Sequence, residues 1–207
     1  MDITLALGGG GAKGNAHIGV LRKLEAEGFR VRAVAGTSFG GIVAAMYAFG
    51  KTPDQIEELF ASVDQNRLYG HAAGDGPSLL GLAGASKLMD DVFGAATFDD
   101  LHLPCALTGV DLKSAREVIL TEGLVRDAIL ATIALPGIFP PRKIQDWELV
   151  DGGTLDPVPV AVARALAPNL PVVAVVSNGP EMEIVTSGCA GSTPLIASVK
   201  AVSSTSS

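Results

Sequence analysis

The chain has 207 residues, of which 48% are hydrophobic and 18% are charged, so it can bury one sizeable core and differs from an intrinsically disordered protein. Its net charge of −7 argues against nucleic-acid binding and against electrostatic recruitment to anionic lipid. The first residues lack the basic region of a signal peptide, and no uncharged apolar run reaches the roughly 18 residues of a membrane span, so a soluble cytoplasmic protein is expected.

Short apolar runs alternate along the chain with longer helix-like stretches. The runs cover residues 3–7, 31–35, 104–110 and 172–176. Such an alternation is typical of buried parallel strands that are covered by helices. It predicts an α/β fold with a mostly parallel sheet, in one domain over residues 1–180. Residues 181–207 are expected to form a short polar segment, with a weak helix candidate at 194–202.

The first apolar run leads into a glycine-rich turn, Gly8 to Gly14, followed by an amphipathic helix-like stretch. A glycine loop at a helix start leaves backbone N–H groups free to bind an anion. Gly9-x-Gly11-x-x-Gly14 fits a dinucleotide pyrophosphate, but the acidic residue expected at the end of the second strand is missing. A triphosphate loop needs Ser or Thr after its lysine, and Gly14 follows Lys13.

The third anion that this loop could bind is the oxyanion of a tetrahedral acyl intermediate. In a parallel sheet, the turns after consecutive strands lie at the same edge, so the glycine loop is expected to face the turn after the second strand. Lys13 either adds positive charge there or extends into solvent, and the sequence leaves both readings open.

The second apolar run ends in Gly36-Thr37-Ser38-Phe39-Gly40, which precedes an apolar helix-like stretch. A serine at a sharp strand-to-helix bend holds its hydroxyl away from its own backbone, where a substrate can approach it. Side chains at the two flanking glycines would collide in so tight a crossing. The pattern predicts that Ser38 is a nucleophile.

Residues 51–100 carry nine acidic side chains against three basic ones. Within this acidic segment, residues 77–82 read Pro-Ser-Leu-Leu-Gly-Leu. Residues 51–100 are expected to be a flap or cap insertion, in which residues 77–82 form either an apolar flap over the site or a loop that contacts the core.

A serine nucleophile needs a base, and none of the three histidines has a suitable setting. His17 lies on the first predicted helix and is expected to pack there, while His71 and His102 lie in polar segments and are expected at the surface. Cys105 and Cys189 match no metal or redox spacing, so no metal site is expected. A carboxylate is better placed, because a short predicted strand ends in Asp151-Gly152-Gly153.

Three segments in chain order, 9–14, 36–40 and 151–153, resemble the patatin-like phospholipase family. Residues 131–141 also resemble the family's segment ahead of its aspartate, although Thr132 and Asp156 stand where the family commonly has serine and asparagine. The similarity runs from about residue 3 to residue 176.

The resemblance implies a three-layer α/β/α fold that hydrolyses lipid acyl esters with a Ser-Asp dyad, without histidine, metal or cofactor. It makes Ser38 the nucleophile and Asp151 the base, with the backbone of Gly9, Gly10 and Gly11 as the oxyanion hole. The supporting residues of the three motifs are Lys13, Gly14, Gly36, Gly40, Gly152 and Gly153.

Several alternatives stay open at this point. Asp111 or Asp156 could be the base instead of Asp151. The chain could bind an acyl chain or a partner on the same fold without turnover, or, less favoured, bind a dinucleotide. Expected partners are a lipid or acyl-ester substrate and a transient apolar membrane contact. A second copy of the chain is a further candidate, because family members usually continue with further helices beyond the last predicted strand.

Overall fold

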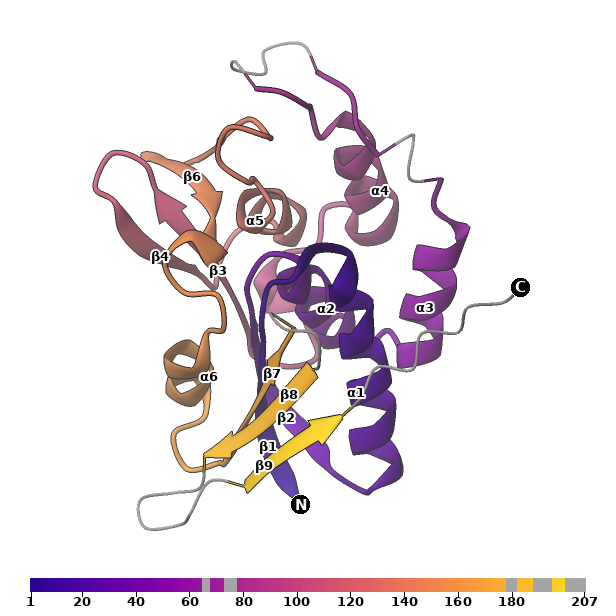
Figure 1. Ribbon diagram of the computed structural model, residues 1–207. Coiled ribbons are helices and arrows are strands. Elements are labelled where there is room, and N and C mark those ends of the chain that lie inside the picture. Colours follow the sequence, from indigo (N-terminus) through magenta and orange to yellow (C-terminus); the bar gives the residue numbers. More distant parts are fainter. Residues whose placement is uncertain (65–67, 73–77, 178–181, 188–194, 200–207) are drawn as a thin grey trace.

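The computed structural model describes residues 1–64, 68–72, 78–177, 182–187 and 195–199. In this part of the chain, one mixed sheet lies between two layers of helices (Figure 1), as predicted for the α/β/α class. The α-helices are α1 (Ala16–Ala26), α2 (Phe39–Ala48), α3 (Pro53–Ser62), α4 (Ala83–Phe93), α5 (Val125–Thr132) and α6 (Val160–Leu166). The described residues also form the short 3-10 helices η1 (Gly11–Asn15), η3 (Phe98–Asp100) and η4 (Gly152–Thr154). No helix among the described residues has both the length and the apolar character needed to cross a bilayer.

The centre of the sheet is parallel and both of its edges are antiparallel. The strand order is β5-β6-β3-β2-β1-β7-β8-β9, and β4 pairs with β3 beside this path. The pairs β1–β2, β1–β7 and β2–β3 are parallel, and all the other pairs are antiparallel. The strands are β1 (Asp2–Leu7), β2 (Arg30–Gly36), β3 (Cys105–Asp111), β4 (Arg116–Leu120), β5 (Arg142–Ile144), β6 (Trp147–Asp151), β7 (Val172–Val176), β8 (Met182–Ser187) and β9 (Leu195–Val199).

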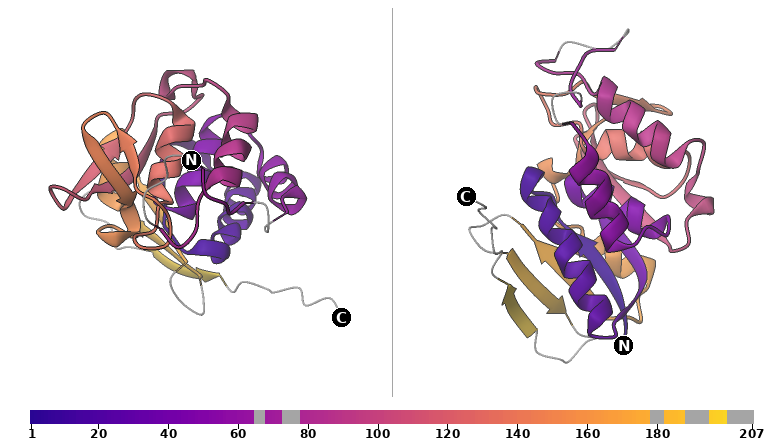
Figure 2. Two further views of the ribbon diagram at one scale, coloured as in Figure 1. Left: turned by 90° about the horizontal axis from the view of Figure 1, so that it is seen from above. Right: turned by 90° about the vertical axis from the view of Figure 1, so that its right-hand side faces the viewer.

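Side chains that alternate along the central strands build a different core on each face of the sheet. Ile3, Leu5 and Leu7 of β1 belong to the larger core, which includes buried residues of α1, α2 and α5. Ala6 faces the other way and packs with small residues of the neighbouring strands under α6. Small alanine side chains let α6 lie close to its face of the sheet. The other face is covered by the larger layer of helices, so the two layers differ in size (Figure 2).

The four apolar runs of the sequence are all strands of the parallel centre, as predicted. The helix candidate at 194–202 is wrong, because Leu195–Val199 is strand β9 and pairs antiparallel with β8. Two β-branched residues in this five-residue strand favour extended backbone, and the pairing supplies the hydrogen bonds that a helix would otherwise make internally. The prediction for Cys189 lies outside the described residues.

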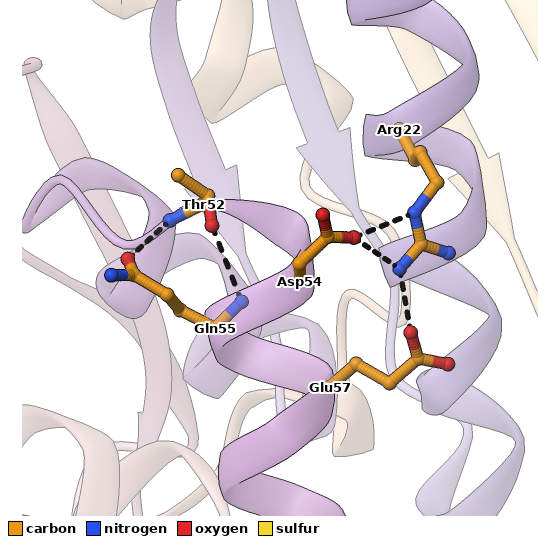
Figure 3. Close-up of polar contacts among 5 residues, drawn as sticks. All are labelled: Arg22, Thr52, Asp54, Gln55 and Glu57. Atoms are coloured by element: carbon orange, nitrogen blue, oxygen red, sulfur yellow. Dashed lines mark hydrogen bonds and ion pairs between the residues drawn. The ribbon is translucent and has the colours of Figure 1, made fainter.

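Residues 51–100 begin with a helix that is fixed firmly to the body of the protein. Thr52 and Gln55 form a reciprocal capping box at the start of α3 (Figure 3). On α1, the Arg22 guanidinium binds the carboxylates of Asp54 at 2.7 Å and Glu57 at 2.6 Å. These ion pairs are exposed and stabilise little by themselves. The completely buried side chain of Ile56 anchors α3 in the core, and the ion pairs add contacts to α1.

Candidate active site

Ser38 lies at the turn between β2 and α2 in a backbone conformation that non-glycine residues rarely adopt, with φ 55° and ψ −128°. The steric role predicted for the flanking glycines is confirmed. A Cβ on Gly36 would collide with the backbone of Gly40 and Gly41, and a Cβ on Gly40 would collide with the carbonyl oxygens of Leu7 and Gly8. The Ser38 N–H donates to the hydroxyl of Thr132 at 2.9 Å.

Strand β3 explains how Asp151, 113 residues away in sequence, reaches this serine. The end of β2 pairs with the first half of β3, with Gly36 opposite Leu107. Antiparallel β6 pairs with the second half, with Asp151 opposite Gly109. Since β4 occupies the other edge of β3, the two strands follow one another along the same edge and their carboxyl ends meet.

Ser38 Oγ donates a hydrogen bond of 2.6 Å to Oδ2 of Asp151. The second carboxylate oxygen, Oδ1, accepts the N–H of Gly153 at 2.8 Å. Asp151 is only 1% exposed. Burial raises the pKa of its carboxyl group above the usual 3.8, while the hydrogen bonds from Ser38 and Gly153 oppose this effect in part. A desolvated carboxylate that touches a hydroxyl is suited to accept its proton.

A threonine that the sequence gave no reason to single out packs beneath this pair. Thr108 of β3 lies against Gly152, where an added Cβ would collide with the Thr108 side chain. Its hydroxyl is 2.7 Å from the hydroxyl of Thr37, the residue before the serine. Thr37 and Thr108 are both completely buried, so the hydrogen bond joins the serine turn to the aspartate turn.

The glycine loop lies beside the serine, as the parallel register of β1 and β2 predicts, since a Cβ built on Gly9 would be 3.2 Å from the Cβ of Ser38. The N–H groups of Gly8 and Gly9 already donate to the carbonyls of Val175 and Pro157. Gly9 is therefore not a free donor, contrary to expectation. Within the described residues, the N–H groups of Gly10 and Gly11 donate to no acceptor, so of the three glycines predicted to form the oxyanion hole these two remain available to an anion.

Two further side chains hold this loop through its carbonyl groups. His17 is completely buried and its Nε2–H donates to the carbonyl of Gly8 at 2.7 Å, while burial lowers the pKa of its ring. Ser177, just after β7, donates to the carbonyl of Gly9, and its side chain fills the space that a Cβ on Gly10 would need. The sequence predicted packing for His17, but it held no local signal for Ser177. His71 and His102 are exposed, as predicted.

The other supporting residues shape the entrance to the loop. Gly11 and Gly14 belong to the 3-10 helix η1, which precedes α1, so the loop does not open directly onto an α-helix as the sequence suggested. Gly14 leaves room for the ring of Phe39, whose centroid lies 5.2 Å from the ring centroid of Phe60. Lys13 is exposed.

A cavity of about 520 Å³ opens next to the serine. Ser38 and Gly11 contribute to its lining, and the remaining lining is almost entirely apolar. One wall comes from α2 and the end of α5, and a second wall from the 51–100 segment, including Leu80 and Leu82 of the stretch predicted as a flap or loop. That second wall is made by Phe60, Val63, Leu68, Tyr69, Leu80, Leu82, Ala85, Leu88 and Met89. The cavity has the size and apolar character of a small-molecule site.

The two alternative bases do not contact the serine. Asp111 accepts the N–H and the hydroxyl of Ser114 and the N–H of Glu148, and these hydrogen bonds lower its pKa to about 2. It therefore orders the turn between β3 and β4. Asp156 accepts the N–H of Val158 at 3.2 Å. Ser38 Oγ donates instead to Asp151.

Known proteins resemble this chain in sequence and in fold. A family model described as patatin-like phospholipase matches residues 5–164. An uncharacterized NTE family protein of Mycobacterium tuberculosis is 34% identical over 86% of this chain and 50% of its own length. A lysophospholipase of Mycosarcoma maydis is 31% identical over 80% of this chain and 9% of its own length, so the chain spans half or less of these relatives. The crystal structure of VipD from Legionella pneumophila matches 75% of the chain and 46% of its own, with a TM-score of 0.58 and 14% identity.

Proposed function

Since the chain belongs to the patatin-like phospholipase family, we propose that it is a serine acyl hydrolase that cleaves fatty-acyl esters of lipids through an acyl-enzyme intermediate. The observation that carries this proposal is the hydrogen bond of 2.6 Å between Ser38 Oγ and the buried carboxylate of Asp151. The hydroxyl therefore has a base within reach at the place where an apolar cavity begins. Residues 1–180 form the hydrolase domain in this proposal, and residues 51–100 cap its cavity. Strands β8 and β9 of the segment 181–207 extend the sheet of this domain by antiparallel pairing.

In the first half of the reaction, Ser38 Oγ attacks the ester carbonyl carbon while its proton passes to Asp151. The carbonyl oxygen becomes an oxyanion, which the N–H groups of Gly10 and Gly11 stabilise. When the tetrahedral intermediate collapses, the C–O bond to the alcohol breaks, and the alcohol leaves with the proton from Asp151. Acyl-Ser38 remains.

Water completes the cycle. It attacks the acyl carbon and gives a proton to Asp151, and a second oxyanion forms at the same N–H groups. Collapse releases the fatty acid and returns the proton to Ser38 Oγ. The fatty-acyl chain lies in the cavity during both steps, while Asp151 keeps its raised pKa because the protein itself buries the carboxyl group.

A fluorophosphonate probe tests whether the serine is activated, because only an activated hydroxyl displaces fluoride at a useful rate. The wild-type protein should become labelled at Ser38, which mass spectrometry of the peptide would show, and a panel of acyl esters should report its preferred chain length and head group. A protein that binds acyl chains without turnover would not label. Absence of labelling in a folded protein at neutral pH would contradict the proposal.

The mouth of the cavity suggests how the protein meets its substrate. Four exposed hydrophobic residues line the cavity, Tyr69, Leu80, Leu135 and Ile138, and the exposed Leu79 is the chain neighbour of Leu80. A hydrogen bond of 2.8 Å from Leu80 N–H to the carbonyl of Ile138 joins two of their segments. The described segments 68–72, 78–82 and 133–140 contain no Asp, Glu, Lys or Arg. An uncharged apolar rim that continues into an acyl cavity fits a neutral or zwitterionic lipid surface, so lipid contact belongs to the proposed function.

Changing Leu79 to serine should weaken binding to phosphatidylcholine vesicles by about tenfold, because this side chain is 72% exposed at the rim and would lose most of its transfer free energy into lipid. Vesicle sedimentation measures the effect, with Ser38→Ala present in every protein to prevent hydrolysis. Leu112→Ser is the matched control, since Leu112 is 48% exposed but lies after β3, outside the rim. Equal losses in both variants, or binding that depends strongly on salt, would contradict lipid contact through the rim.

A further inference from the structure

The end of α5 and the residues just after it contact the apolar cavity and both members of the proposed dyad. Ile129 and Ile133 line the apolar cavity. Thr132 accepts the N–H of the nucleophile, Ser38, through its hydroxyl at 2.9 Å. The carbonyl of Ala134, two residues later, accepts the N–H of Asp151 at 2.9 Å. One short segment therefore contacts the acyl cavity and the backbone of both members of the dyad.

The backbone conformation of Ser38 is strained, and the hydrogen bond from its N–H to Thr132 helps to hold it. With φ 55° and ψ −128°, Ser38 precedes α2 as its N-cap, but its side chain makes no capping bond since it is turned to Asp151. The N–H is partly buried, and the hydroxyl of Thr132 is its acceptor. A strained conformation persists only where the surroundings over-determine it, and this hydrogen bond is one such constraint.

The methyl group of Thr132 has a separate role. Thr132 is completely buried, and a Cβ built on Gly41 would lie 2.8 Å from its Cγ2. The methyl group therefore packs against the first turn of α2 and holds the threonine rotamer. Packing and hydrogen bonding come from different atoms of one side chain, so mutation can separate them.

We propose that Thr132 is a positioning residue of the proposed hydrolase: its hydroxyl holds the backbone of Ser38 so that Oγ stays in line between the Asp151 carboxylate and a carbonyl carbon held by the Gly10 and Gly11 N–H groups. The proposal rests on the proposed function. It assigns a catalytic consequence to the hydroxyl group and only a packing consequence to the methyl group.

The test compares Thr132→Val, which keeps the shape and loses the hydroxyl, with Thr132→Ser, which keeps the hydroxyl and loses the methyl group. Thr132→Val should lower kcat for a soluble short-chain ester by about 100-fold, as expected for a misplaced reacting group, with KM changed less than about threefold. Thr132→Ser should keep kcat within about threefold of wild type, although it loses a buried methyl group and so should melt below the wild type.

Labelling by the fluorophosphonate probe separates this proposal from the proposed function. If the wild type does not label, the proposed function fails and Thr132 has no reaction to support. If the wild type labels and Thr132→Val labels equally fast, or if Thr132→Ser loses as much kcat as Thr132→Val, the positioning role is overturned. Should Thr132→Val not fold, Thr132→Ala replaces it, because it differs from Thr132→Ser only in the hydroxyl, and Thr132→Ser should be at least about tenfold faster.

Discussion

Changing Ser38 to alanine is expected to remove turnover of acyl esters, with a loss in kcat on the order of 10⁴-fold or more. Alanine keeps the Cβ that the strained turn already accommodates, and it removes only the hydroxyl that would attack the carbonyl carbon. The N–H groups of Gly10 and Gly11 would still stabilise an oxyanion, so the small remaining activity reports their contribution. Hydrolysis of a short-chain nitrophenyl ester by the purified variant measures the effect.

The matched control is Ser62→Ala, because Ser62 is an exposed serine at the end of α3. Its activity should equal that of the wild type. Ser38→Ala should also have a free energy of unfolding about 1–3 kcal/mol lower than the wild type at neutral pH, since the buried Asp151 carboxylate loses one of its two donors. Retained turnover in folded Ser38→Ala protein would show that the reaction proceeds without the proposed nucleophile.

The serine turn could be predicted from sequence because its constraints are local. Gly36 and Gly40 are required by collisions with backbone atoms of the same turn and of the neighbouring strand, which the pentapeptide pattern itself encodes. The proximity of the glycine loop follows from a general rule, since the turns after two adjacent parallel strands lie at one edge of the sheet. Both inferences need only short-range geometry and strand adjacency.

The contact between Ser38 and Asp151 needed more than local geometry. It depends on β6 running antiparallel along the same edge of β3 that β2 occupies first, and no residue pattern near Asp151 specifies that register. Only the family resemblance connected the two residues. Thr108 and Ser177 were missed for the same reason, because each acts through a neighbour that is distant in the chain.

The glycine loop shows the opposite kind of error, in which a pattern predicts too much. Three consecutive glycines suggest three equivalent N–H donors, but the carbonyl of Pro157 takes the one on Gly9. That carbonyl lies just before α6, far from the loop in sequence. Which donors of a glycine loop remain free is therefore decided by the elements that pack around the loop.

Changing Asp151 to asparagine should lower kcat for acyl esters by roughly 10³-fold, because the amide cannot accept the proton of Ser38. The fold should tolerate the change. The amide oxygen can accept the Gly153 N–H, and the NH₂ group can donate to Ser38 Oγ, so both present contacts keep a partner. In the wild type, kcat/KM should fall as the pH is lowered through the raised pKa of Asp151, and the variant's remaining activity should lack this limb.

The same variant should be more stable than the wild type at neutral pH. Burial raises the pKa of Asp151 in the folded state above its usual 3.8, so between these two values the folded state binds more protons than the unfolded state. The free energy of unfolding of the wild type therefore falls as the pH rises through this window, and the cost of the buried carboxylate is fully present above it. Asparagine is neutral throughout, so its stability advantage should be present at neutral pH and disappear as the pH approaches 3.8 and below. Urea unfolding at several pH values measures the free energy of unfolding of both proteins. A variant that is less stable than the wild type at neutral pH would mean that the Ser38 and Gly153 hydrogen bonds outweigh the desolvation of Asp151, and that its pKa is lowered in the folded protein.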